Sequence, residues 1–111
     1  MTTDAARHDI GRQRHEDATS RESRRRLEHE REVRLSQVAA IERTPQYVTD
    51  EVMLAQLDTA RSALEEVEAA LRRMNDGTYG LCDACQAPIP AGRLEILPHA
   101  RFCVTCQRRR R

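Results

Sequence analysis

The stretch Gly80-Leu81-Cys82-Asp83-Ala84-Cys85 is followed, after seventeen further residues, by Cys103-Val104-Thr105-Cys106, and the two together contain all four cysteines of the chain. Each Cys-x-x-Cys pair forms a tight turn that directs two thiolates at one point, and two such pairs at this separation are typical of tetrahedral zinc. Four thiolates leave no coordination position open for water, so the predicted site is structural rather than catalytic. We therefore predict one structural Zn²⁺ held by Cys82, Cys85, Cys103 and Cys106.

Other uses of four cysteines are less consistent with the sequence. Two disulfides need an oxidising compartment, but Met1-Thr2-Thr3-Asp4 does not begin an export signal. A thioredoxin-like redox pair would need a βαβ pattern, and none surrounds either motif. An iron–sulfur cluster with four thiolate ligands is the remaining chemical alternative. His99 lies between the two motifs, and we expect it on the surface near the metal rather than in place of a cysteine ligand.

Composition limits the size of the fold. The chain has 111 residues, a third of them charged, with no Trp and one Phe, so it forms at most one small domain with a limited core. The metal is then needed to hold the C-terminal third together. No apolar run is long enough to cross a membrane, and we expect a soluble, cytoplasmic protein. The 19 basic residues, all Arg, nearly balance the 18 acidic ones, which argues against nucleic-acid binding driven by net charge.

Two helices are expected before the cysteines. Residues 1–18 are polar and aperiodic, and are predicted to form a flexible arm. Thr19-Ser20-Arg21-Glu22 matches a capping box, and helix-forming residues continue to about Glu42 without Gly or Pro. Pro45 interrupts this pattern, and Thr49 or Asp50 is suited to cap the next helix.

The second helix has an unbroken heptad pattern of apolar residues. Its outer face is expected to include Glu66, Arg72 and Arg73, and Asn75-Asp76-Gly77 ends it, with Gly77 in a left-handed conformation. The apolar positions, spaced alternately by four and three residues, are Met53, Leu57, Ala60, Leu64, Val67, Leu71 and Met74.

This apolar seam needs a partner, and the first helix can supply it by folding back. Pairing Ile41 with Met53 places Leu35 or Arg34 beside Ala60 and Leu27 beside Val67, and the register ends where the capping box begins. The agreement favours an antiparallel hairpin within a monomer over a parallel dimer. The predicted fold is mainly α: an antiparallel two-helix coiled-coil hairpin followed by a small four-cysteine zinc finger. The predicted segments are the arm (1–18), the hairpin (19–76, tip at about 43–50), the zinc finger (77–107) and a basic tail (108–111).

The zinc finger is expected to have little regular structure. Pro88 and Pro90 make the segment between the cysteine pairs irregular. The residues 93–97 are apolar at alternate and neighbouring positions, and we expect them to form a short turn or strand that covers the zinc.

The chain resembles the DksA/TraR family of bacterial zinc-finger transcription regulators. The resemblance is specific over about residues 64–106. It rests on the order of a helical hairpin, Asp-Gly-Thr-Tyr-Gly-Leu-Cys-Asp-Ala-Cys (76–85), Pro88-Ile89-Pro90, Arg93-Leu94-Glu95 and Phe102-Cys103-Val104-Thr105-Cys106. The resemblance implies a non-enzymatic regulator that binds RNA polymerase and inserts its coiled-coil tip through the secondary channel, without sequence-specific DNA contacts.

Two features depart from the family pattern. The loop lacks the acidic tip motif Asp-x-x-Asp-x-Ala, and the positions where ppGpp-responsive members have basic residues are Glu66, Leu97 and Gln107. We therefore expect modest effects on transcription and no synergy with ppGpp. The resemblance places at the polymerase-facing tip the residues Glu42, Thr44, Tyr47, Asp50 and Glu51.

Two other functions compete with a polymerase regulator. A nucleic-acid-binding zinc module would contact phosphates with Arg clusters, chiefly Arg108, Arg109, Arg110 and Arg111. A structural coiled-coil adaptor would use the hairpin to dock another coil. The sequence shows no paired carboxylates, nucleophile constellation or phosphate loop, so an enzyme is not expected.

Overall fold

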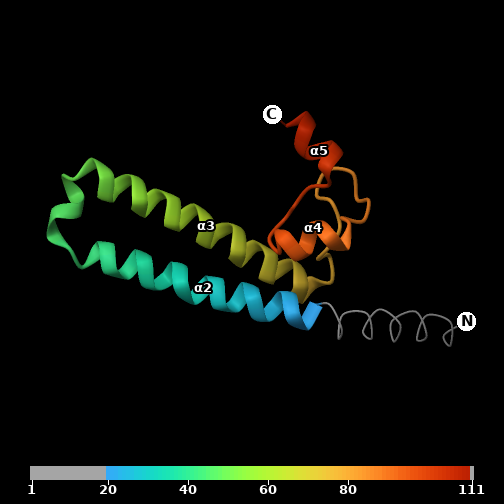
Figure 1. The fold of residues 1–111 in the computed structure, drawn as a ribbon, viewed down its shortest axis with the longest axis horizontal. Helices are drawn as coiled ribbons and strands as arrows, with labels where there is room; N and C mark the ends of the chain where they lie inside the picture. The colour runs from blue at the N-terminus through green and yellow to red at the C-terminus, as the bar shows by residue number, and fades with distance from the viewer. Residues whose placement is uncertain (1–19, 111) are drawn as a thin grey trace, which may run out of the picture.

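The computed structural model describes residues 20–110 and shows two long helices packed as a hairpin, with a small cysteine-containing module at one end (Figure 1). This part of the chain extends 62 × 30 × 22 Å. The predicted fold class is confirmed, and the predicted arm over residues 1–18 lies outside the described range. The elements in chain order are α2 (Arg21–Glu42), the 3-10 helix η2 (Pro45–Val48), α3 (Glu51–Asp76), α4 (Ala91–Ile96) and α5 (Val104–Arg109).

Specific residues fix both ends of α3. The Asp50 side chain accepts a hydrogen bond of 3.0 Å from the backbone N–H of Met53, which confirms the predicted cap. At the other end Gly77 has φ +82°, and the N–H groups of Thr78 and Tyr79 both donate to the carbonyl of Arg73. A left-handed glycine and these returning bonds stop the helix and turn the chain toward the first cysteine pair.

Helix α2 begins without a side-chain cap among the described residues. Ser20, which precedes it, makes no cap hydrogen bond. Thr19, the first residue of the expected capping box, lies outside the described range. Within the described range, α2 is stabilised by its packing against α3.

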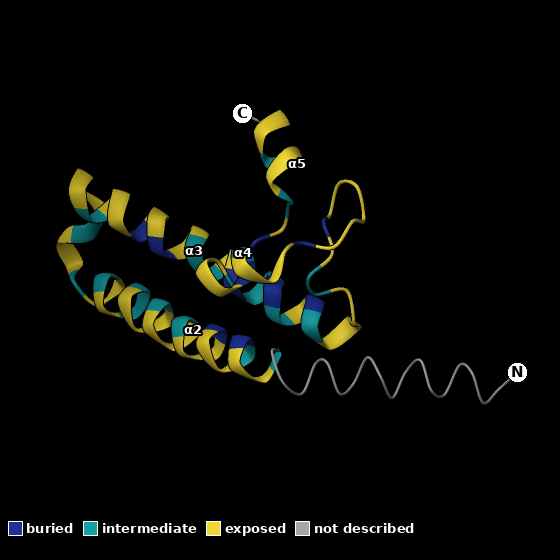
Figure 2. Cartoon of the chain, turned by 45° about the vertical axis from the view of Figure 1, so that its right-hand side comes forward, coloured by how far each residue is buried: buried dark blue, intermediate teal, exposed yellow. Residues whose placement is uncertain are grey.

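Packing in the hairpin is densest beside the cysteine module. Leu27 of α2 packs with Val67 and Ala70 of α3, all three at most 2% exposed. This contact confirms the predicted register at Leu27 and Val67. Figure 2 shows mostly exposed and half-buried residues toward the free end, where Leu57 and Ala60 of α3 are buried.

At the middle of the hairpin, either Leu35 or Arg34 of α2 was expected beside Ala60, and the structure places Arg34 there. Arg34 and Ala60 line the same groove between the helices, whereas Leu35 is 39% exposed. The stem of Arg34 thus takes the place of an apolar residue, and its guanidinium reaches Glu30 on the same helix at 2.8 Å.

The segment before the second cysteine pair differs from the prediction. The expected turn or strand over residues 93–97 is wrong, because α4 covers this region. The carbonyl of Pro90 accepts from the N–H groups of Arg93 and Leu94, which starts the helix. Leu94 packs into the core of the cysteine module, while Ile96, two residues later in the helix, is 77% exposed.

No helix among residues 20–110 is both long and apolar enough to cross a lipid bilayer.

Candidate metal centre and hairpin tip

The first cysteine pair is shaped by a tight backbone turn. Gly80 has φ +88°, and adjacent to it Leu81 forms an isolated antiparallel bridge with Pro88. The N–H of Cys82 donates to the carbonyl of Ala87, and the carbonyl of Cys82 accepts from the N–H of Gln86. These bonds close a loop around residues 82–87 and direct Cys82 and Cys85 to the same side.

The second pair lies at the start of α5. Cys103 directly precedes the helix and Cys106 is in its first turn, where the carbonyl of Cys103 accepts from the N–H of Gln107 at 2.9 Å. The backbone N–H of Asp83 donates to the carbonyl of Arg101, and the Arg101 guanidinium lies 3.0 Å from the Asp83 carboxylate. A main-chain bond and an ion pair therefore hold the two pairs together.

The four sulfur atoms form one compact cluster. The Sγ atoms of Cys82, Cys85, Cys103 and Cys106 lie within 4.8 Å of one another, and those of Cys85 and Cys103 are 3.8 Å apart. A tetrahedral ion with Zn–S bonds of about 2.3 Å separates its sulfur ligands by about 3.8 Å. A disulfide would need about 2.05 Å. An iron–sulfur cluster would spread the thiolates over several irons. The donor set and spacing thus fit a single Zn²⁺.

Ionisation differs among the thiols of this cluster. Burial opposes ionisation of Cys82, but hydrogen bonds from the backbone of Cys103, Cys85 and Ala84 outweigh it and lower the pKa of the thiol to about 6. Hydrogen bonds to the neighbouring cysteines raise the pKa of Cys106. Cys82 is therefore the first of the two to become a thiolate, the form that binds metal.

A small apolar core supports the metal centre. Cys82 and Cys106 are buried with Ile89, Leu94 and Ala100. Zinc would add a crosslink to this core, which is too small to order the module by hydrophobic burial alone.

Tyr79 connects this core to the hairpin. Its ring packs against both apolar clusters, and its hydroxyl donates to the carbonyl of Pro98 at 2.7 Å. Burial raises the pKa of Tyr79, an effect reduced by a hydrogen bond with Ser23 of α2. One aromatic side chain thus contacts the cores of both parts of the molecule.

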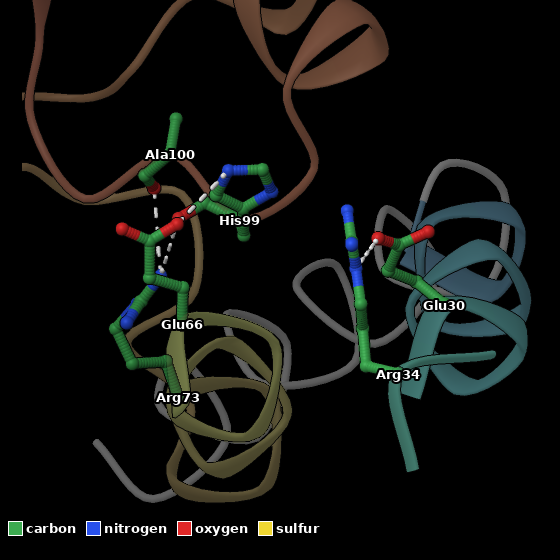
Figure 3. A network of polar contacts seen from close by, with 6 residues as sticks. All are labelled: Glu30, Arg34, Glu66, Arg73, His99 and Ala100. Atoms are coloured by element: carbon green, nitrogen blue, oxygen red, sulfur yellow. Dashed lines mark hydrogen bonds and ion pairs between the residues drawn. The ribbon is translucent and has the colours of Figure 1, made fainter. Parts of the chain in front are cut away.

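Arg73 forms a second connection that the sequence analysis missed. It was expected on the outer face of α3, but it is only 9% exposed, and its Nη2 donates to the carbonyls of His99 and Ala100 at 3.3 and 3.5 Å (Figure 3). Burial lowers the pKa of Arg73. The same figure shows His99 beside Glu66, with Nε2 and Oε2 3.4 Å apart. His99 therefore contacts the hairpin rather than the metal.

The three positions at which ppGpp-responsive family members have basic residues line one hollow near Arg73 and His99. Glu66, Leu97 and Gln107 all line it, together with several arginines. None of the three is basic, and the Glu66 carboxylate is already beside His99.

The predicted tip residues fall into two groups. Three of them support the turn: Glu42 lies 2.7 Å from Arg61, the hydroxyl of Thr44 donates to the carbonyl of Ala40, and Asp50 caps α3. The other two are Tyr47 and Glu51, whose side chains make no hydrogen bond or ion pair within the described range.

The predicted basic tail is partly helical. Arg108 and Arg109 belong to α5, Arg110 follows it, and Arg111 lies outside the described residues. The Arg110 guanidinium lies 4.4 Å from the centre of the Phe102 ring, and that of Arg101 lies 5.1 Å from it.

Comparison with known proteins agrees with this geometry. Residues 77–111 match the family described as the prokaryotic dksA/traR C4-type zinc finger. General stress protein 16O of Bacillus subtilis is 51% identical over 47 residues, 42% of this chain and 29% of that protein. The RNA polymerase-binding transcription factor DksA of Caulobacter vibrioides is 32% identical over 89 residues, 80% of this chain and 63% of that protein. The chain thus spans less than two thirds of either relative.

A solved structure extends the likeness to the hairpin. Transcription factor DksA2 from Pseudomonas aeruginosa matches with a TM-score of 0.54 and 25% identity, covering 95% of this chain and 83% of that one. Residues 77–111 are thus a zinc finger of the dksA/traR C4 type, and with the hairpin before them the chain has a DksA2-like fold.

Proposed function

We propose that this protein is a non-enzymatic transcription regulator that binds RNA polymerase and inserts its hairpin tip through the secondary channel. The observation that carries the proposal is the likeness over 80% of the chain to a protein named an RNA polymerase-binding transcription factor. A regulator of this kind acts in the cytoplasm, and one chain supplies both the rod and the metal centre, so we propose that it acts as a monomer.

The shape of the described part supports a probing role. The tip lies at one end of a body 62 Å long, and the metal centre lies at the other end (Figure 1). The tip can therefore enter a narrow opening while the zinc module remains outside. Cys82, Cys85, Cys103 and Cys106 would hold the zinc, which would crosslink the module and fix the base of the hairpin.

Two of the proposed tip residues are suited to test this proposal. Substitution of Asp50, Thr44 or Glu42 would disturb the turn itself, so loss of function there would be ambiguous. Tyr47 and Glu51 can be changed with less effect on folding. The test variant is therefore Y47A/E51Q, and its control is E28Q, which changes an exposed residue of α2 far from the tip.

The assay measures polymerase binding and transcription in vitro with zinc-loaded protein. We expect Y47A/E51Q to lose its effect on transcription while zinc content and helicity remain those of the wild type, and E28Q to behave as the wild type. If Y47A/E51Q equals the wild type in both polymerase binding and transcription, tip insertion is refuted. If the unmodified chain fails to bind polymerase, the whole proposal is refuted.

A further inference from the structure

We propose that the basic end of the zinc module, formed by Arg108, Arg109 and Arg110, binds the phosphate backbone of double-stranded DNA without reading its sequence. The proposal goes beyond polymerase binding and does not depend on it. It begins with an unequal distribution of charge. Residues 97–111 contain five Arg and no Asp or Glu, while the preceding residues contain more acidic than basic side chains. The C-terminal segment is therefore strongly basic, although the net charge of the whole chain is only +1.

The guanidinium groups of this surface are available. Arg108 and Arg109 are exposed, and within residues 20–110 their side chains make no hydrogen bond or ion pair. Two acidic groups of the module and hairpin are engaged elsewhere, because Asp83 pairs with Arg101 and Glu66 lies beside His99. Free guanidinium groups can form bidentate hydrogen bonds with phosphate oxygens.

Arg110 is positioned by an aromatic ring. Its guanidinium lies over Phe102 at 4.4 Å, a contact that orients the planar group while the N–H donors at its edge remain able to bind. Such a contact also reduces the side-chain entropy lost when a phosphate is bound.

The arrangement fits an extended backbone better than a small anion. Three consecutive residues on a helical path spread over about 200° around the axis. Arg108 and Arg110 therefore border the hollow beside Glu66, Leu97 and Gln107, whereas Arg109 is not among its lining residues. Figure 1 shows α5 projecting away from the hairpin at the end opposite the tip. Guanidinium groups spread around a projecting helix in this way can reach successive phosphates along a duplex.

Double-stranded DNA is favoured over single strands because no aromatic ring on this surface is free to stack on bases. Phe102 is already in contact with the guanidinium groups of Arg101 and Arg110. Tyr79 is half-buried and bonded to Pro98, and Tyr47 lies at the opposite end of the hairpin. Binding of single strands relies on such stacking, whereas contacts with duplex phosphates do not.

The test is fluorescence anisotropy of labelled 30-bp duplexes of two unrelated sequences, titrated with the zinc-loaded full chain between 50 and 200 mM salt. Three phosphate contacts predict a slope of log K against log salt of about −2.7, equivalent to a loss of affinity of about 40-fold over this range. The variant R108Q/R109Q/R110Q should lose nearly all of this slope. The control R25Q/R43Q/R72Q removes the same charge from exposed sites on α2, after α2 and on α3, and should retain the slope.

Because Arg110 packs on Phe102, the variant R108Q/R109Q provides a check that leaves this contact intact. It should lose about two thirds of the slope, with unchanged zinc content and circular dichroism. Each of the following results would overturn the proposal: undetectable duplex binding at 50 mM salt, equal losses in the control, tighter binding to single strands, or a more than tenfold preference between the two duplexes. Polymerase is absent from the assay, so its result is independent of the proposed function.

Discussion

Leu27→Ala should destabilise the hairpin strongly, because this side chain fills the densest part of its core. Leu27 is 1% exposed and packs against Val67 and Ala70, both at most 2% exposed. Removing three carbons costs about 2.4 kcal/mol at about 0.8 kcal/mol for each. The small side chain of Ala70 cannot fill the space, so an incompletely closed cavity adds about 1 kcal/mol. We expect the free energy of unfolding to fall by about 3–4 kcal/mol.

The assay is urea unfolding of the zinc-loaded protein, followed by circular dichroism at 222 nm. The matched control is Leu35→Ala, the same chemical change on the same helix at a residue that is 39% exposed. We expect it to cost less than about 1 kcal/mol, because Leu35 is only partly buried and its truncation leaves no enclosed cavity. Equal losses in the two variants would refute the register that places Leu27 in the hairpin core.

Four further predictions concern the cap, the metal and the ppGpp positions. Asp50→Ala should lower the free energy of unfolding by about 1 kcal/mol in urea titrations, because the Met53 N–H loses its acceptor; an unchanged midpoint would contradict the cap. Metal analysis should find one zinc per chain, and Cys82→Ser should release it and expose residues 78–106 to protease. Zinc binding by the metal-free protein should also weaken as the pH falls through about 6, the lowered pKa of Cys82, because protons then compete with metal for the thiolate; equal affinity at pH 7 and pH 5 would contradict this. The effect of this protein on transcription in vitro should be the same with and without ppGpp, because Glu66, Leu97 and Gln107 offer no positive charge to it.

The parts of the fold set by local pattern could be predicted from the sequence. The heptad spacing from Met53 to Met74 predicted α3, and Asp50 and Gly77 marked its ends, because caps and left-handed glycines act within a few residues. The cysteine spacing likewise predicted the four-sulfur cluster. Each of these signals depends on neighbours along the chain.

The features that escaped prediction depend on contacts between distant segments. Arg73 follows Arg72 in sequence and looked equally exposed, yet carbonyl groups 26 and 27 residues later bury it. The sequence does not indicate that the carbonyl groups of His99 and Ala100 lie against α3. Helix α4 was missed for a related reason, since six residues give too short a pattern to distinguish a helical turn from a strand.

The uneven packing along the hairpin has a mechanical consequence. In α2 the buried residues are Ser23 and Leu27, both within its first two turns. The half of α2 near the tip has only half-buried and exposed residues, so the packing there depends on Leu57 and Ala60 of α3. Backbone amides near the tip should exchange with solvent at a lower free-energy cost than those near the zinc module. The hairpin is therefore stiff at its base and compliant at its free end, so the tip can bend to follow a confined path while its base stays rigidly oriented.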